Sequence, residues 1–107
     1  MVSWFRAATR PPGIVPVQFE WDPAKSASNI EKHAITFEEA STIFGDTLST
    51  TIVDPDISAA ELRFVTLGRS SSGKLLVVVH VDRSNATRIV SARRATKQEQ
   101  KRYEEQN

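Results

Sequence analysis

The sequence predicts an α+β domain in which helices pack on one face of an antiparallel sheet. Two segments between residues 22 and 45 combine helix-start signals with apolar residues at helical spacing. Four β-branched segments then follow one another between residues 47 and 94, joined by short turns as in an antiparallel meander. With a strand before the helices and a polar helix at the end, the expected order is β-α-α-β-β-β-β-α.

Length and composition limit the classes of protein. The chain has 107 residues, enough for one small domain, and 39% of them are apolar. It has no cysteine, which excludes disulfides, thiolate metal sites and cysteine nucleophiles. No apolar run approaches the roughly 18–20 residues of a membrane helix. Because Pro11, Pro12 and Pro16 also interrupt the stretch where a signal peptide would lie, we expect a cytoplasmic protein.

Residues 1–17 have neither a helical nor an alternating period. They combine prolines, a glycine and two arginines, so we expect a flexible N-terminal extension before a single domain over residues 18–107. Residues 19–21 predict a short strand.

The first helix is predicted from Asp22-Pro23, the favoured order of an N-cap and a first helical residue. It is expected to reach about His33, with Ala24, Ala27 and Ile30 on a narrow apolar side.

The second helix is predicted from Thr36, because Glu39 follows at the spacing of a capping box. Gly45 is a natural C-cap for it. The last helix has the same signal at Thr96 and Glu99 and carries almost no apolar residues, so it needs a surface on which to dock.

The formal net charge of +1 hides a strong asymmetry along the chain. Residues 18–62 carry nine acids and two lysines, whereas residues 63–107 carry ten basic residues and four acids. Such a basic half is typical of proteins that bind nucleic acid or an acidic partner. Since the chain folds back on itself, the two halves could equally neutralise each other.

The predicted strands are rich in arginine. Arg63 and Arg69 have the same parity and are expected on one face of the sheet. Guanidinium groups bind phosphate well through a fixed fork of donors, although an ordinary solvated sheet face would look similar. The basic residues of this region are Arg63, Arg69, Lys74, Arg83, Arg88, Arg93 and Arg94.

Two histidines are candidates for proton transfer. Leu75, Val77, Val79 and Val81 form one wholly apolar face of a strand, so His80 is expected on the other, less buried face. His33 closes the first helix, where a protonated imidazole favours the negative end of the helix dipole. A purely structural role stays open for both.

The sequence has no metal-binding motif and no glycine-rich phosphate loop. An enzyme built from it is therefore expected to work without a cofactor. RNA cleavage suits arginine, histidine and tyrosine, because the 2′-hydroxyl of the substrate can itself attack the neighbouring phosphate.

Several separated motifs resemble one known family in the right order. The segments are FEWDPAK, KHAITFEEA, ELRFVTLGRS, LLVVVHVD and RIVSARRATKQEQKRYEE, and they span about Phe19 to Glu105. The chain resembles the BrnT toxins of bacterial type II toxin–antitoxin pairs. One departure stands out, because Ala34 replaces the glycine of the family's KHG motif.

This resemblance implies a RelE-like fold and a metal-independent endoribonuclease that arrests translation and growth. It implies a BrnA-like ribbon-helix-helix antitoxin as partner, with operator DNA bound only through the complex. It also matches Ser91 and Arg102 to family motifs.

On this hypothesis, the residues have distinct roles. The scissile phosphate is expected to contact Arg63, Arg69 and Arg93. We assign proton transfer first to His80, with His33 and Tyr103 as alternatives. The RNA backbone is expected to contact Lys74, Arg88 and Arg94. The alternatives are a non-catalytic basic binding module and an inactive homologue. We expect the last helix or the neighbouring sheet edge to contact the antitoxin.

Overall fold

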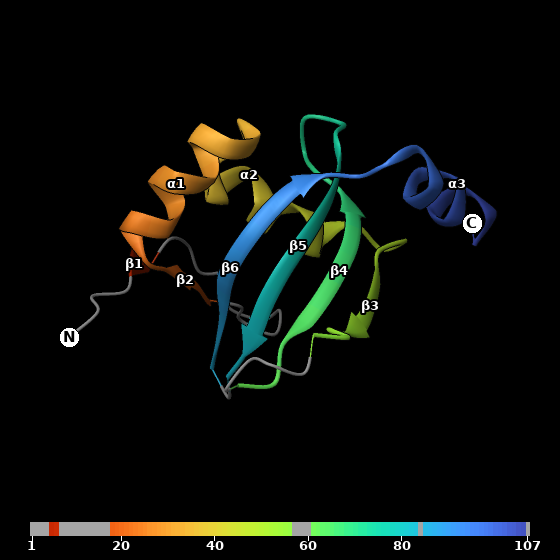
Figure 1. The fold of residues 1–107 in the computed structure, drawn as a ribbon. Coiled ribbons are helices and arrows are strands. Elements are labelled where there is room, and N and C mark those ends of the chain that lie inside the picture. The colour runs from red at the N-terminus through yellow and green to blue at the C-terminus, as the bar shows by residue number, and fades with distance from the viewer. Residues whose placement is uncertain (1–4, 7–17, 57–60, 84, 107) are drawn as a thin grey trace.

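The computed structural model describes residues 5–6, 18–56, 61–83 and 85–106 (Figure 1). Three α-helices and a short 3-10 helix accompany six strands in this part of the chain. The elements are β1 (Phe5–Arg6), β2 (Gln18–Trp21), α1 (Pro23–His33), α2 (Phe37–Ser41), η1 (Thr42–Gly45), β3 (Thr50–Val53), β4 (Phe64–Arg69), β5 (Leu75–Asp82), β6 (Ala86–Arg94) and α3 (Lys97–Glu105). From β2 onward, they confirm the predicted order of helices and strands.

The strands form one sheet in the order β1-β2-β6-β5-β4-β3. Strands β3 to β6 make the predicted antiparallel meander. Strand β2, however, pairs parallel with β6, with Gln18 opposite Ala86. The expectation of a purely antiparallel sheet was therefore wrong, and the sheet is mixed. Local turn signals could not show this, because the pairing joins segments that are more than sixty residues apart. The likeness to RelE-type toxins stays a prediction.

Residues 1–17 fall almost entirely outside the described residues, so the expected flexibility of this segment stays a prediction. The exception is β1, whose backbone pairs antiparallel with β2, Phe5 opposite Trp21.

The hydrophobic core lies between one face of the sheet and the segment that runs from Ile35 through α2 to η1. Trp21 and Phe37 meet edge to face there, with ring centroids 5.8 Å apart. Burial of each such ring contributes roughly 1.5–3 kcal/mol. The core residues are Phe19, Trp21, Ile35, Phe37, Ala40, Ile43, Leu76, Val78, Ile89 and Ala92.

Helix α1 faces the sheet with a polar residue. Ala24, Ala27 and Ile30 are exposed, Ile30 to 44%, so the predicted apolar side was wrong. Asn29 is buried instead. Its amide nitrogen donates to the carbonyls of Ala92 (2.9 Å) and Ile35 (3.0 Å), and its oxygen accepts from the Ala92 N–H at 3.0 Å. The side chain thus pairs with the edge of β6 as a strand would.

Helix α3 lies against the opposite face of the sheet, beyond the end of β4 (Figure 1). The expectation that all helices share one face was therefore wrong. Tyr103 docks this polar helix: it is buried, and its hydroxyl donates to Asp46 at 2.7 Å. The guanidinium of Arg69 lies 5.4 Å from the centre of its ring. Thr96 and Glu99 form the predicted capping box at the start of the helix.

Helix α1 ends at a residue with left-handed backbone geometry. Ala34 has φ 58° and ψ 31°, and its N–H donates to the Ile30 carbonyl at 2.8 Å. An alanine in this region is strained relative to glycine, because its Cβ approaches the carbonyl oxygen.

Ala34→Gly is expected to raise the free energy of unfolding by about 0.5–1 kcal/mol, since glycine relieves this strain and fits a helix C-cap. Urea and thermal unfolding followed by circular dichroism measure the effect. The matched control is Ala27→Gly in the exposed interior of α1, expected to cost about 1 kcal/mol. A loss of stability in the Ala34 variant would contradict the strain.

Candidate functional site

Within the described ranges, no helix has the length and apolarity that crossing a membrane requires. In the same residues, no group of three His, Cys, Asp or Glu side chains is placed to hold a metal ion. The candidate site is therefore sought among the basic residues and histidines.

The arginines of the sheet lie in two groups, one at each end of the strands. Arg63 precedes β4 and Arg69 ends it, so their backbones lie about 20 Å apart at 3.3 Å per residue. Arg88 lies opposite Val81 on β5 and Arg93 lies opposite Val77. The structure therefore does not gather Arg63, Arg69 and Arg93 at one point.

The first group includes Arg83 and Arg88, and both form ion pairs with acidic side chains. Arg88 is buried, and its Nη1 lies 3.3 Å from a Glu61 oxygen, while its Nε lies 3.7 Å from Glu20. Arg83 approaches the same two carboxylates at 4.0 and 3.9 Å. Arg88 is thus built into the sheet, which leaves little of its side chain for the expected contact with RNA.

The second group contains an ion pair with two hydrogen bonds. Arg93 donates to both carboxylate oxygens of Glu99, at 2.8 and 2.9 Å, and so ties β6 to α3. The two bonds from Arg93 are the main reason that the pKa of Glu99 is lowered to about 2, and they raise the pKa of Arg93. About 42% of the Arg93 side chain remains exposed, so it can still reach a ligand.

Arg69 and Tyr103 support each other at the end of β4. Arg69 donates to the Gly73 carbonyl at 3.0 Å. Burial is the main cause that raises the pKa of Tyr103, and its hydrogen bond to Asp46 adds to the rise. Tyr103 therefore holds its proton at neutral pH and serves as a docking residue for α3.

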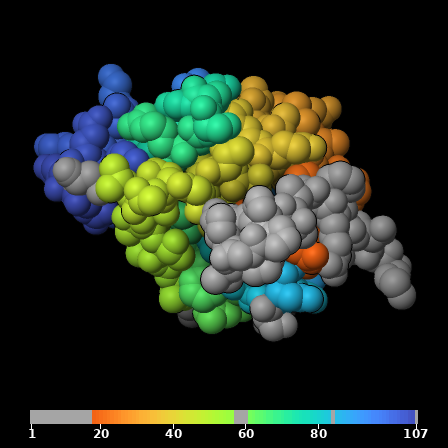
Figure 2. Space-filling view, turned by 180° about the vertical axis from the view of Figure 1, so that it is seen from behind, coloured from red at the N-terminus to blue at the C-terminus, as the bar shows by residue number. Residues whose placement is uncertain are grey.

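Lys74 belongs to a turn that is fastened to the helical layer. It lies 3.7 Å from Glu39 of α2, and the hydroxyls of Ser70 and Ser72 donate to the same carboxylate. The bond from Ser72 is the largest cause of the lowered pKa of Glu39. Figure 2 shows this turn and α2 as one continuous surface.

His80 lies in the core, so the expectation that its face is less buried was wrong. It is 2% exposed, and its ring contacts Phe44 and Phe64 at centroid distances of 4.9 and 5.9 Å. Its ring nitrogens hydrogen bond to Thr66 and Asp82, both at 2.7 Å. Burial lowers its pKa. The sequence predicted the wrong buried face because both faces of β5 are apolar. Only the position of the helices decides which face they cover.

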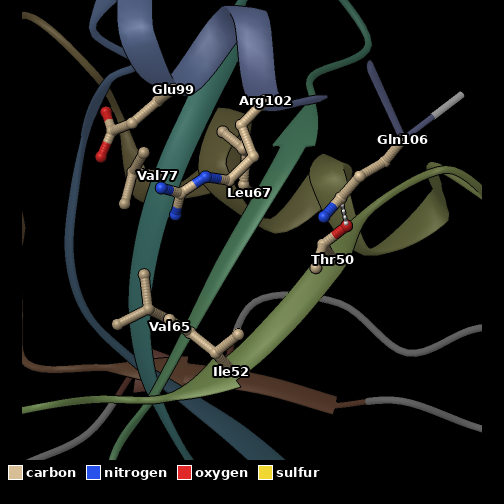
Figure 3. A pocket seen from close by; sticks show the side chains of 8 residues that line it. All are labelled: Thr50, Ile52, Val65, Leu67, Val77, Glu99, Arg102 and Gln106. Carbon is tan, nitrogen blue, oxygen red and sulfur yellow. Dashed lines mark hydrogen bonds between the residues drawn. The ribbon is translucent and has the colours of Figure 1, made fainter. Parts of the chain in front are cut away.

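The open face of the sheet has an apolar floor. Val65, Leu67 and Val77 lie under Arg102 of α3, in a pocket of 90 Å³ (Figure 3). The Thr50 hydroxyl donates to Gln106 at 2.8 Å at its rim. A neighbouring pocket of 320 Å³ shares Val65 and Val77 and adds Val79, Ser91 and Arg93. This face is therefore less basic than the sequence implies.

A third pocket, with a mainly polar lining, lies between α1 and β6. His33 is exposed at its rim, and Arg94 is exposed at the nearby end of β6. The volume is 190 Å³, and the lining residues are Lys25, Ser28, Asn29, Lys32, His33, Val90 and Ser91. No role was predicted for the two lysines, although their helical spacing with His33 is visible in the sequence.

A profile of the family described as the ribonuclease toxin BrnT of type II toxin–antitoxin systems matches residues 21–99. The chain belongs to the BrnT family. The fold is similar to the crystal structure of the Brucella abortus ribonuclease toxin BrnT, with a TM-score of 0.53 at 24% sequence identity. This similarity covers 72% of the present chain and 94% of the Brucella chain. No curated protein gives a significant match.

Membership of the BrnT family confirms the resemblance found in the motifs. It assigns the chain to ribonuclease toxins, which imply an RNA substrate and an antitoxin partner. The match begins at Trp21, so residues 1–17 lie outside it.

The Arg93–Glu99 pair predicts a specific dependence of stability on pH. Because the folded pKa of Glu99 is depressed, the pair stabilises the fold above the unfolded value near 4.5, and this is lost as pH falls toward 2. Both side chains are partly exposed, so we expect about 1 kcal/mol. As the pH is lowered from 4.5 toward 2, the melting temperature of Glu99→Gln should fall less than that of wild type, because the variant has no ion pair to lose. Glu104→Gln, on the exposed side of α3, should show the same fall as wild type. An equal fall in wild type and Glu99→Gln would contradict the pairing.

Proposed function

We propose that this BrnT-family protein cleaves RNA without a metal ion and thereby blocks translation and arrests growth. The observation that carries the proposal is the family match over residues 21–99. The accessible basic residues add support, since cleavage by the 2′-hydroxyl needs cations that stabilise the charge growing on the phosphate. Arg93 and Arg63 are proposed to contact different phosphates of the RNA, because both side chains are only partly buried and they lie toward opposite ends of the strands.

The partner is proposed to be a BrnA-like ribbon-helix-helix antitoxin, with operator DNA bound only through the complex. The edge strand β3 supports a protein partner. Ile52 and Val53 are 54% and 55% exposed there, and the strand is joined to α3 through Thr50 and Gln106. Apolar edge strands are unusual on monomers, because they invite pairing with another chain. Growth arrest on induced expression, relieved when a candidate BrnA-like antitoxin is expressed together with the protein, tests the partnership.

The second candidate function is a basic module that binds RNA without cleaving it. The observation that favours it is the pairing of Arg88 and Arg93 with acids, which lowers the positive charge available for catalysis.

Purified protein is expected to cut labelled RNA in excess EDTA and to leave 2′,3′-cyclic phosphate ends. An RNA with 2′-O-methyl groups throughout should be bound and left intact, because its nucleophile is blocked. Gel electrophoresis with end analysis measures both results. A shift in RNA mobility without cleavage would favour the binding module, and cleavage that EDTA abolishes would contradict metal independence.

Arg93→Ala is expected to reduce the cleavage rate about 10-fold, since the variant loses a cation that binds the RNA backbone and helps to hold the substrate in place. Glu99→Gln is the matched control: it breaks the same ion pair with α3 and keeps the guanidinium, so its activity should stay within about threefold of wild type. Arg63→Ala is expected to relieve the growth arrest that induced expression of the wild-type protein causes. If the cleavage rates of Arg93→Ala and Glu99→Gln fall equally, the ion pair serves only the stability of the fold.

A further inference from the structure

The pocket between α1 and β6 exists because β2 is short. Strand β2 pairs with β6 only from Gln18 to Glu20, opposite Ala86 to Arg88. The next part of that edge of β6 faces α1, and the 190 Å³ pocket lies between them. Its polar lining distinguishes it from the apolar pockets of the opposite face.

One stripe of α1 supplies most of the lining. Lys25, Ser28, Asn29, Lys32 and His33 recur at helical spacing, so their side chains project from one side of the helix. Asn29 binds the backbone of Ala92 at the base of this stripe. The lysines and the histidine are therefore held beside β6 by a buried hydrogen-bonded anchor.

The strand side of the pocket is irregular. Val79 of β5 pairs with Ser91, whereas its neighbour His80 pairs with Ile89, which leaves Val90 as an extra residue in β6. Such a bulge twists the strand and turns side chains in new directions, and bulges are frequent beside active sites. Val90 and Ser91 line the pocket at this point.

No ion pair of the described residues neutralises the charge of the pocket. Among the ion pairs of the described residues, none includes Lys25 or Lys32, whereas Arg83, Arg88, Arg93 and Lys74 each have an acidic partner. Both lysines and His33 are exposed. The lining residues contribute two permanent cations and no carboxylate, which suits a phosphate group.

Ser91 connects this pocket with the open face of the sheet. It lines both the α1–β6 pocket and the 320 Å³ pocket that contains Arg93. An RNA strand that has one phosphate beside α1 can therefore cross the edge of β6, and the next part of its backbone can reach Arg93.

We propose that the α1–β6 pocket is the phosphate-binding catalytic subsite for single-stranded RNA, an assignment that rests on the proposed ribonuclease function. Lys25 and Lys32 bind the phosphate, and His33 is the catalytic base. The neutral imidazole takes the proton of the 2′-hydroxyl, the O2′–P bond forms and the P–O5′ bond breaks. Water donates a proton to O5′, and the hydroxide that remains takes the proton from the imidazolium of His33, so the products are a 2′,3′-cyclic phosphate and a 5′-hydroxyl.

The first test measures binding without cleavage. A 2′-O-methyl RNA is titrated against wild type, Lys25→Gln/Lys32→Gln and the control Lys97→Gln/Lys101→Gln, which removes the same charge from α3. We expect the α1 double variant to lose about 10-fold or more in affinity, and its slope of log K against log salt to fall by about 1.4, for two lost phosphate contacts. Equal affinity and slope in the three proteins would overturn the subsite, whether or not wild type cleaves RNA.

The second test measures cleavage with His33→Gln. The single-turnover rate should fall about 100-fold or more while affinity for the 2′-O-methyl RNA stays within about threefold. The titratable groups of the pocket are Lys25, Lys32 and His33, so the acid limb of the pH–rate profile should vanish in this variant. All three side chains are exposed, and unchanged melting temperatures check the fold.

The outcomes separate the two proposals. If wild type cleaves RNA and His33→Gln cleaves equally well with the same pH profile, the assignment of the base is overturned and the ribonuclease function stands. If wild type binds RNA without cleaving it, the ribonuclease function and the base both fail, and the binding test alone decides the phosphate subsite.

Discussion

One buried amide holds the helical layer on the sheet. Asn29 uses both of its N–H donors and its oxygen on the backbone of Ala92 and Ile35. Because an unpaired buried polar group costs about 1–3 kcal/mol, these bonds define where α1 lies along β6. The position of the basic stripe of α1 beside β6 follows from this contact.

The charge asymmetry of the chain has two outcomes in the fold. Part of the basic half is neutralised by the acidic half, since Arg88 meets Glu20 and Glu61, and Lys74 meets Glu39. The interpretation that the halves balance each other is correct for these residues. The lysines of α1 come from the acidic segment and have no acidic partner among the described ion pairs. A charge count by segment therefore misplaces the accessible positive charge.

The two histidines show how burial separates similar candidates. His80 is enclosed by Phe44 and Phe64, and its burial lowers its pKa. His33 ends α1 in solvent, next to an alanine held in left-handed geometry. Strained backbone of this kind persists where the surrounding structure imposes it, and it is frequent at functional sites. For proton transfer to RNA, accessibility favours His33.

Local signals in the sequence determined the elements and the family. The caps at Asp22, Thr36 and Thr96 act within one helical turn, so the helix starts follow from nearby residues. The separated motifs likewise sufficed for the BrnT resemblance, because their order along the chain is itself the signal.

Only the tertiary structure decided the parallel pairing of β2 with β6, the buried face of β5 and the placement of α3 on the opposite side. Each depends on contacts between distant segments. In β5, the residues of both faces are mainly apolar, so the sequence alone does not show which face is buried. For the same reason, the pocket that combines Lys25 and His33 with Ser91 could not be seen in the sequence, because a helix and a strand edge roughly sixty residues apart create it.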